Sequence, residues 1–361
     1  MDAELIPTVA AITSGSSRSG IRSAWEKGRS IGCDLPPWIG PESRVLIKPD
    51  LTPSMADRVG TVKPMLRLLE SVAATVATRT KHVVVADSPG LVSGKTTEWY
   101  DRLGLPQMAA RVGFSLLCLE CADLHPLFVS SRLHLAPIPA LQSDFVVSLT
   151  HVSPESEPSF RGPLLAASGL IPGLQRRFVK VSSAPSKAFA TAAVDAVSLI
   201  NPALNIALVE GERSRSGLLA LSHDAVALEA CLLNLLGRGR SLELKMASDA
   251  GLGIGWADCV NWIGDLGRRC TVSVAPGSLS ATGRMSARRA VSALRRCFLE
   301  EGKSFDPSTC SRCQKCRVGC PVHAISLDRH GKIEIDEDRC CHCFRCNELC
   351  PEGAMRYTIP H

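Results

Sequence analysis

The sequence predicts an α/β protein in which a mostly parallel sheet is covered by helices on both faces, followed by a small cysteine-rich domain of α+β type. Two observations lead to this prediction. Through about the first 305 residues, short apolar runs alternate with amphipathic stretches, as strands and helices do around a parallel sheet. Nine of the 16 cysteines then lie between Cys310 and Cys350. We therefore expect an α/β domain over residues 1–305 and a second domain over residues 306–361.

The elements of the predicted sheet follow from short runs of apolar residues that are the right length for buried strands. The expected strands are Thr8–Thr13, Val45–Lys48, Val83–Asp87, Phe114–Leu119, Phe145–Leu149 and Asn205–Val209. Helices are expected between them, at Ile21–Ile31, Val62–Thr78 and Ala188–Leu199. In such a fold, binding sites form at the carboxyl ends of the strands.

Composition and charge exclude several classes of protein. Apolar residues make up 45% and charged residues 21%, as in ordinary globular proteins. The net charge of +6 is mild, and no basic stripe is interleaved with aromatic residues, so nucleic-acid binding is not expected. The longest weakly charged run, Ala196–Val209, contains Asn201 and Pro202 and is too short to span a bilayer. We expect a cytoplasmic protein, in which many cysteines indicate metal ligation rather than disulfides.

The cysteines near the C-terminus form an internal repeat. Cys310-x2-Cys313-x2-Cys316-x3-Cys320-Pro321 is followed by Cys340-x2-Cys343-x2-Cys346-x3-Cys350-Pro351, so that every cysteine recurs at one constant offset. Three cysteines at intervals of three can wrap around three corners of a [4Fe–4S] cluster, and the fourth ligand must come from elsewhere. The spacing therefore predicts two [4Fe–4S] clusters.

In two-cluster ferredoxins the fourth cysteine of each run ligates the other cluster. The assignment that follows gives one cluster to Cys310, Cys313, Cys316 and Cys350, and the second to Cys340, Cys343, Cys346 and Cys320. Ala324–Leu327 and Lys332–Ile335 read as a short hairpin between the runs. The chain from residue 306 onward resembles a bacterial two-[4Fe–4S] ferredoxin domain.

Two features of the runs leave alternatives. A zinc site is the other metal centre that cysteine pairs form, but zinc sites use two CxxC pairs with a long spacer, or cysteine and histidine together. The cations Arg312, Lys315, Arg317 and Arg345 lie between the ligands, where they either favour the reduced clusters or point to solvent. Using Cys341 as a ligand in place of Cys340 would break the spacing, so we expect Cys341 to be a spare thiol.

The preceding segment resembles the bacterial and archaeal family called domain of unknown function (DUF) 362. The resemblance covers roughly residues 5–265 and is carried, in order, by Arg44–Leu51, Val83–Gly90, Asp144–Leu149, Gly169–Gly173 and Ser222–Ala230. Members of this family often carry a C-terminal double-cluster segment. Where the family usually has "ALKN", this chain has Leu164-Leu165-Ala166-Ala167, so two polar positions are apolar here. The family also usually has asparagine at the position of Asp50.

Four residues are candidates for a substrate site. Lys48 and Asp87 each end an expected strand and His151 follows one, so their side chains would converge on one crevice that binds an anionic or carbonyl substrate. The resemblance to DUF 362 adds Asp224, and it also carries Lys48 and Asp87. The other interpretation is that each of them is an ordinary turn residue.

Cys118, Cys121 and His125 are residue types that could form a metal site. A strand from Phe114 that extends to Cys121 would place the two cysteines on opposite faces, about 10 Å apart. We therefore expect buried cysteines that act as small hydrophobic residues.

Three functions are compatible with these features. In the first, the protein is an oxidoreductase whose clusters relay electrons from a soluble donor to a small-molecule substrate in the α/β domain. In the second, it is a carrier or adaptor that passes electrons to a partner protein. In the third, which we rank last, the clusters are structural or sense oxygen.

Overall fold

The computed structural model describes residues 6–15, 17–51, 62–89, 95–129, 132–152, 162–171, 185–210, 216–265, 303–329, 331–340 and 343–357. We call residues 6–265 the body and residues 303–357 the tail. The body is built on an eight-stranded sheet in the order β10-β1-β9-β8-β7-β2-β3-β4. Its strands are β1 (Thr8–Gly15), β2 (Val45–Pro49), β3 (Val83–Asp87), β4 (Ser115–Cys118), β7 (Phe145–Val152), β8 (Leu204–Glu210), β9 (Ser216–Ser222) and β10 (Asn261–Gly264).

The sheet is parallel except at β9, which runs antiparallel to both of its neighbours, β1 and β8. The fold class expected from the sequence is thus confirmed, and all six expected strands are present. The two strands of this sheet that the sequence did not reveal, β9 and β10, both pair with β1.

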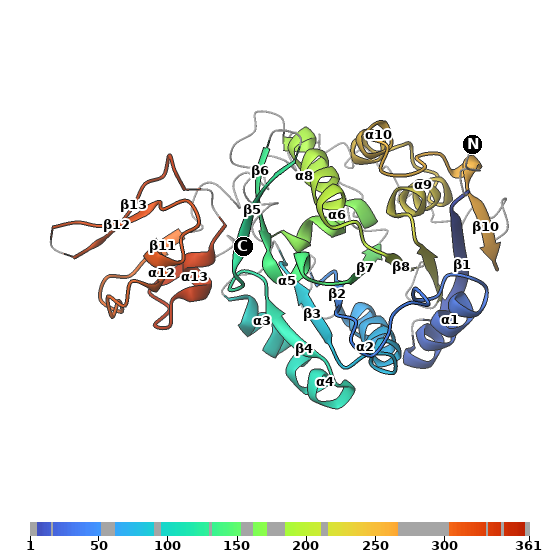
Figure 1. The fold of residues 1–361 in the computed structure, drawn as a ribbon, viewed down its shortest axis with the longest axis horizontal. Helices are drawn as coiled ribbons and strands as arrows, with labels where there is room; N and C mark the ends of the chain where they lie inside the picture. Colours follow the sequence, from blue (N-terminus) through green and yellow to red (C-terminus); the bar gives the residue numbers. More distant parts are fainter. Residues whose placement is uncertain are drawn as a thin grey trace, which may run out of the picture.

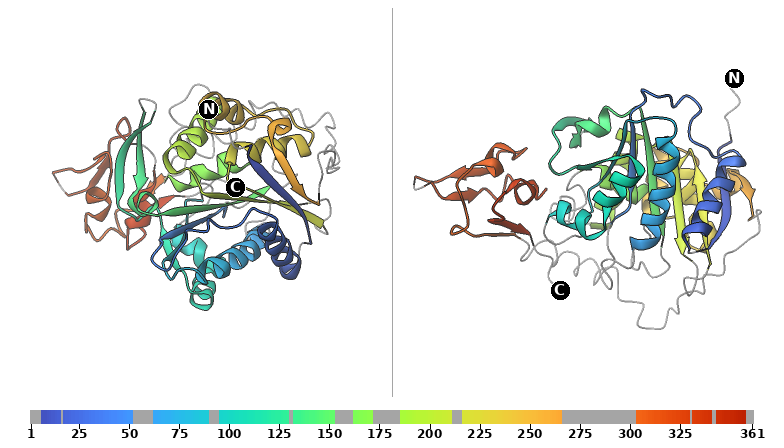
Figure 2. Two further views of the ribbon diagram at one scale, coloured as in Figure 1. Left: turned by 45° about the vertical axis from the view of Figure 1, so that its right-hand side comes forward. Right: turned by 90° about the horizontal axis from the view of Figure 1, so that it is seen from below.

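Helices cover both faces of the sheet (Figure 1 and Figure 2). One face carries α1 (Arg18–Ser30), α2 (Lys63–Ala77), α3 (Thr96–Arg102) and α4 (Leu105–Val112). The other carries α6 (Pro163–Ala167), η2 (Ser168–Leu170), α8 (Pro185–Ile200), α9 (Ala225–Leu235) and α10 (Leu242–Asp249). The remaining elements of the body are the hairpin β5 (Leu124–Val129) and β6 (Arg132–Pro137), α5 (Ile138–Leu141) and η4 (Ala257–Cys259).

Local sequence explains where these helices begin. The Ser17 hydroxyl accepts a hydrogen bond from the Gly20 N–H and caps α1, which satisfies one of the free donors of the first turn. Pro64 lies in the first turn of α2, where its missing N–H costs nothing. Apolar residues of α1 and α2, among them Trp25 and Leu68, bury themselves in one large core under the sheet.

The chain order creates a switch point at the centre of the sheet. From β2 the chain moves outward to β3 and β4, and it then returns to place β7 on the other side of β2. The connection after β2 therefore runs toward β3 and the connection after β7 runs toward β8, so the chain leaves the carboxyl ends of these two neighbouring strands in opposite directions. In open α/β sheets this is the position where a crevice for ligands forms.

The tail packs against the edge of the body that carries β4 and α3 (Figure 1). It contains two small sheets, β11 (Lys303–Phe305) with β14 (Met355–Tyr357) and β12 (Ile325–Leu327) with β13 (Ile333–Ile335), and two short helices, α12 (Lys315–Val318) and α13 (Arg345–Leu349). The β12–β13 hairpin is the one expected between the cysteine runs. Among the described residues, no helix is long and apolar enough to cross a membrane.

Candidate functional site

The eight cysteines of the two runs line two separate cavities in the tail. Cys310, Cys313, Cys316 and Cys350 line one of them, and Cys320, Cys340, Cys343 and Cys346 line the other. Each cavity thus takes three cysteines from one run and the last cysteine from the other run. A set of four converging thiols is the donor set that a [4Fe–4S] cluster requires, so the residues present fit this group. Cys341 lies outside the described residues.

The backbone of each run is bent in the same way around its cavity. Gln314 and Phe344, which occupy equivalent positions in the two runs, both have left-handed conformations, with φ of 59° and 57°, directly before α12 and α13. Non-glycine residues adopt this conformation rarely and mostly at functional sites. Backbone N–H groups also point at the sulfur atoms, as from Ala324 to Cys320 Sγ at 3.3 Å. The two runs therefore share one backbone conformation, which places N–H groups beside cysteine sulfur atoms.

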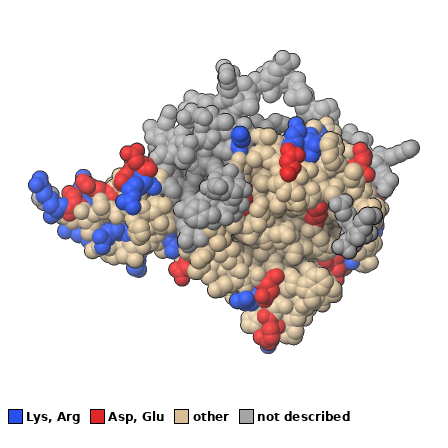
Figure 3. All heavy atoms as spheres, turned by 45° about the horizontal axis from the view of Figure 1, so that its top comes forward, with Lys and Arg blue, Asp and Glu red and all other residues tan. Residues whose placement is uncertain are grey.

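The cations between the ligands divide into two groups. Arg312, Lys315 and Arg317 are exposed, in agreement with the interpretation that these side chains point to solvent. Figure 3 shows cationic and acidic side chains interspersed over the tail. Val318, 78% exposed, lies beside them on α12. Arg345, by contrast, is partly buried and faces the body.

The junction between tail and body is held by hydrogen bonds from both sides. Arg345 Nη1 donates to the carbonyl oxygens of Glu120, at 2.7 Å, and of Ala122. From the body, Lys95 Nζ donates to the carbonyl oxygen of Cys350 at 2.7 Å, and the Thr96 N–H donates to Glu348 Oε1 at 2.6 Å. The helix within the second cysteine run is therefore fixed to the end of β4 and the start of α3.

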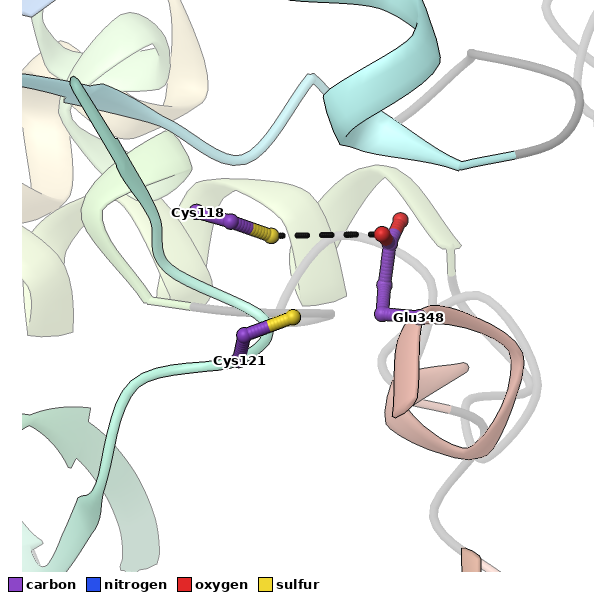
Figure 4. A group of neighbouring side chains, drawn as sticks. All are labelled: Cys118, Cys121 and Glu348. Carbon is purple, nitrogen blue, oxygen red and sulfur yellow. Dashed lines mark hydrogen bonds between the residues drawn. The ribbon is translucent and has the colours of Figure 1, made fainter. Parts of the chain in front are cut away.

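Cys118 and Cys121 lie at this junction, and here the expectation from the sequence was wrong. The strand β4 ends at Cys118, and a turn closed by a hydrogen bond from the Cys121 N–H to the Cys118 carbonyl oxygen reverses the chain. The two sulfur atoms and a Glu348 carboxylate oxygen consequently lie within 4.8 Å of one another (Figure 4). Cys121 is exposed rather than buried, and His125 is not part of the group. The hydrogen bond between the thiols raises the pKa of Cys118 and lowers the pKa of Cys121.

A chain of contacts leads from this junction into the body. Cys118 Sγ lies 3.9 Å from Glu348 Oε2 and 3.7 Å from Glu120 Oε2. The other oxygen of Glu120 accepts a hydrogen bond of 2.5 Å from the hydroxyl of Ser88, which directly follows Asp87. Glu120 and Ser88 are both buried. The α13 helix is thus connected, through side chains in contact, to the carboxyl end of β3.

Lys48 and Asp87 meet at that end of the sheet, beside the switch point. Lys48 Nζ lies 3.2 Å from Asp87 Oδ1, and the two side chains are only 2% and 1% exposed. The Leu51 N–H donates to Asp87 Oδ2 at 3.0 Å. Burial raises the pKa of Asp87 to about 6, although Lys48 opposes this shift. Gly169 packs against both side chains, because a Cβ atom there would lie 2.6 Å from Asp87 Oδ1 and 2.8 Å from Lys48 Cε.

Two further polar residues share the face of the sheet that carries Lys48. Ser148 on β7 is the register partner of Lys48, and Asn205 on β8 is the register partner of Ser148. Both are fully buried, and among the described residues Ser148 Oγ and Asn205 Oδ1 have no hydrogen-bond partner. Sequence reasoning missed them. The only signal was a small polar residue inside each apolar run, and their alignment becomes visible only with the strand register.

The other two candidates, His151 and Asp224, lie on other parts of the sheet than the Lys48–Asp87 pair. His151 lies near the carboxyl end of β7, three positions after Ser148, so strand alternation puts it on the opposite face. Asp224 follows the antiparallel strand β9 and therefore lies at the other end of the sheet. Its carboxylate caps α9 by accepting hydrogen bonds from Val226 and Ala227 and also accepts one from Ile254.

The fold and the two cysteine-lined cavities define an α/β protein with an iron–sulfur tail. A family model for a 4Fe–4S dicluster domain matches residues 309–354, so the tail carries [4Fe–4S] clusters and has an electron-transfer role. A second model, described as domain of unknown function (DUF362), matches residues 45–234, more than half of the chain. The protein therefore belongs to the DUF362 family.

The chain also matches curated proteins over short stretches. They include pyruvate synthase subunit PorD of Methanocaldococcus jannaschii, 38% identical over 51 residues, and a ferredoxin of Pyrobaculum islandicum, 33% identical over 51 residues. The match spans 59% of the first of these relatives and 48% of the second, but only 14% of this chain.

Among solved structures, part of the chain is similar to the lactate racemase apoprotein from Thermoanaerobacterium thermosaccharolyticum. The sequence identity is 13% and the TM-score is 0.39, over 60% of this chain and 54% of that chain.

Proposed function

We propose that the protein is an oxidoreductase in which the tail passes electrons to a substrate bound at the switch point of the body. The observation that carries this proposal is the continuous set of contacts from α13 through Glu348, Cys118, Glu120 and Ser88 to Asp87. A short, packed path between a cluster-binding tail and a buried ion pair favours direct delivery over diffusion. We propose a domain boundary close to the expected one between residues 305 and 306 but just before β11, because β11 pairs with β14 of the tail.

The proposed cluster ligands are the cysteines that line the two cavities, with Cys310, Cys313, Cys316 and Cys350 in one set and Cys340, Cys343, Cys346 and Cys320 in the other. Clusters bound there would supply and accept single electrons. The body's own residues have different tasks. The Lys48 ammonium group would bind an anionic or carbonyl oxygen, while Asp87, whose pKa is raised to about 6, holds a proton more readily than an ordinary carboxyl group.

Electrons would enter the tail from a soluble carrier at the exposed face of α12. Cys313 is exposed, and Arg312, Lys315 and Arg317 surround it with positive charge. Val318 adds an exposed apolar contact. This combination suits an acidic electron carrier, since complementary charge speeds encounter between proteins.

The test is anaerobic reoxidation of the dithionite-reduced protein by a panel of carboxylates and carbonyl compounds, followed by cluster absorbance. Lys48→Met should slow substrate-dependent reoxidation at least about tenfold, because the variant loses the charge that binds substrate. Iron should stay at about eight per chain. The matched control is Lys245→Met, which removes an exposed lysine from α10. Equal rates in both variants would contradict the proposal.

The second candidate function is an electron carrier or adaptor without its own substrate. It is favoured by α6, whose residues Leu164, Leu165, Ala166 and Ala167 are all buried and apolar, and by the closed Lys48–Asp87 pair. If no small molecule reoxidises the clusters while a purified redox partner does, this second function is the correct one.

A further inference from the structure

We propose that Cys118, Cys121 and Glu348 form a zinc-binding site that ties the tail to the body. Their sulfur and carboxylate atoms lie within 4.8 Å of one another and come from three places, the end of β4, the turn after it and α13. In Figure 4 the three side chains point toward a common space. None of them belongs to the eight cysteines that line the tail's cavities.

The fold holds all three ligands in place, and Cys118 is the last residue of β4. The turn after β4 brings Cys121 back beside Cys118. Arg345 fixes this turn from the tail through the carbonyl oxygens of Glu120 and Ala122. The Thr96 N–H holds Glu348 Oε1, while Glu348 Oε2 lies 3.9 Å from Cys118 Sγ. The arrangement is therefore built by the fold and not by chance proximity of mobile side chains.

The donor set selects the class of metal. Two thiolates and a carboxylate are typical ligands of zinc, at about 2.3 Å for sulfur and about 2.0–2.2 Å for oxygen. Tetrahedral geometry at these lengths puts the ligand atoms somewhat closer together than 4.8 Å, a contraction that side-chain rotation provides. Oxygen-only cations such as magnesium would not choose two sulfurs.

Zinc would also relieve an electrostatic conflict at the junction. The carboxylate of Glu120 lies 3.7 Å from Cys118 Sγ on the inner side of the group, and Glu348 lies on the outer side. Two carboxylates beside the same thiol repel each other, whereas a dication attracts both. Because the ligands come from both tail and body, the free energy of zinc binding would stabilise the docking of the tail on the body. Zinc has no redox chemistry of its own, so it would hold Glu348 and Cys118, two residues of the electron path proposed above, without taking up electrons itself.

The test uses the full-length, anaerobically purified protein with its iron intact, dialysed against micromolar zinc chloride. We expect about one zinc per chain besides about eight irons, and zinc-edge X-ray absorption showing two sulfur ligands at about 2.3 Å with the rest oxygen or nitrogen. In Cys118→Ser/Cys121→Ser the zinc should be lost and the iron kept. Glu348→Gln should weaken zinc retention roughly tenfold.

Cys259→Ser is the matched control, since it removes another exposed cysteine of the body outside the group, and it should retain the zinc. Three results would each overturn the proposal. They are zinc content that is equal in the wild type and the double variant, four sulfur ligands with a matching loss of iron (zinc in a cluster cavity), and a Cys118–Cys121 disulfide without metal in protein kept under reducing conditions.

Discussion

The guanidinium group of Arg345 donates a 2.7 Å hydrogen bond to the carbonyl oxygen of Glu120 and so joins the second cysteine run to the end of β4. Arg345 lies between two cysteines that line the same cavity, Cys343 and Cys346, while Glu120 lies between Cys118 and Cys121. One contact therefore links a proposed cluster loop to the backbone of a proposed metal loop. Within the part of the chain that the structure describes, Arg345, Lys95 and Thr96 donate hydrogen bonds across the junction, so the docking of the tail is open to test.

Arg345→Ala should loosen the tail without removing its clusters. The Thr96 N–H is in the first turn of α3, where no helical partner exists, and it donates to Glu348 instead. Hydrogen exchange at this amide should therefore accelerate in the variant. The Trp99 amide, bonded within α3 to the Lys95 carbonyl oxygen, is the internal control. Unchanged protection at Thr96 would mean that the bond from Arg345 is not needed for docking.

Arg356→Ala gives the matched control for that variant. Arg356 is exposed, and its side chain bonds locally, to the Gly353 carbonyl oxygen. Exchange at Thr96 should be the same as in the wild type. Iron measured in both variants, expected at about eight per chain, separates loss of docking from loss of clusters.

Alanine variants of single cysteines should sort into two spectroscopic classes that cross the two runs. If the cavities hold the clusters as proposed, Cys350→Ala disturbs the same cluster as Cys316→Ala, and Cys320→Ala the same cluster as Cys346→Ala. Electron paramagnetic resonance of the reduced proteins reports which cluster is changed. Grouping of Cys350→Ala with Cys346→Ala would show that each run holds a cluster by itself.

Gly169→Ala should destabilise the body and displace the Lys48–Asp87 pair. The new methyl group would lie 2.6 Å from Asp87 Oδ1, which is too close for any carbon atom, so a buried ion pair must move. We expect a loss of about 1–3 kcal/mol in the free energy of unfolding. Gly239→Ala is the comparison, since nothing lies within 4 Å of its Cβ position, and urea unfolding of it should match the wild type.

Glu229→Gln should stabilise the protein at pH 8 and have little effect at pH 4. Glu229 is fully buried in α9, and burial, followed by the nearby Glu243, raises its pKa from 4.5 to about 8. The folded protein therefore keeps a proton that the unfolded chain releases between these values, so the free energy of unfolding falls as the pH rises from about 4.5 to about 8. Glutamine does not ionise, so the variant avoids this decrease in the free energy of unfolding, which is on the order of a few kcal/mol.

The contacts of Glu229 suit the replacement. The Leu164 N–H donates to one carboxylate oxygen at 2.9 Å, and the Ser241 hydroxyl lies 3.1 Å from the other, where the glutamine amide can donate instead. Urea unfolding at a series of pH values measures the effect. Glu26→Gln, on the 56% exposed side chain of α1, should leave the slope with pH unchanged. A parallel slope in Glu229→Gln and the wild type would rule out Glu229 as its source.

The predictable parts of this protein are those that sequence-local patterns determine. Lys48 and Asp87 could be placed together because both follow apolar strands and the carboxyl ends of parallel strands share one edge. The strand β9 was missed because Ser216–Ser222 contains Gly217 and has no β-branched residue, so its own propensity to form a strand is low. It is a strand because it pairs with neighbours on both sides. Cys118 and Cys121 were misplaced because a single turn decides whether two cysteines three positions apart diverge or meet. The proximity of Glu348 could not be predicted because it depends on how the tail docks on the body.

The pairing of β1 has a consequence for the order in which the chain can fold during synthesis. Both neighbours of β1 come from far along the sequence, since β9 begins at Ser216 and β10 at Asn261. While the ribosome is still adding the central strands, the first strand to emerge has two bare edges, each able to pair with a foreign chain. A nascent chain that has not yet reached Ser216 therefore leaves both edges of β1 open to pairing with other chains.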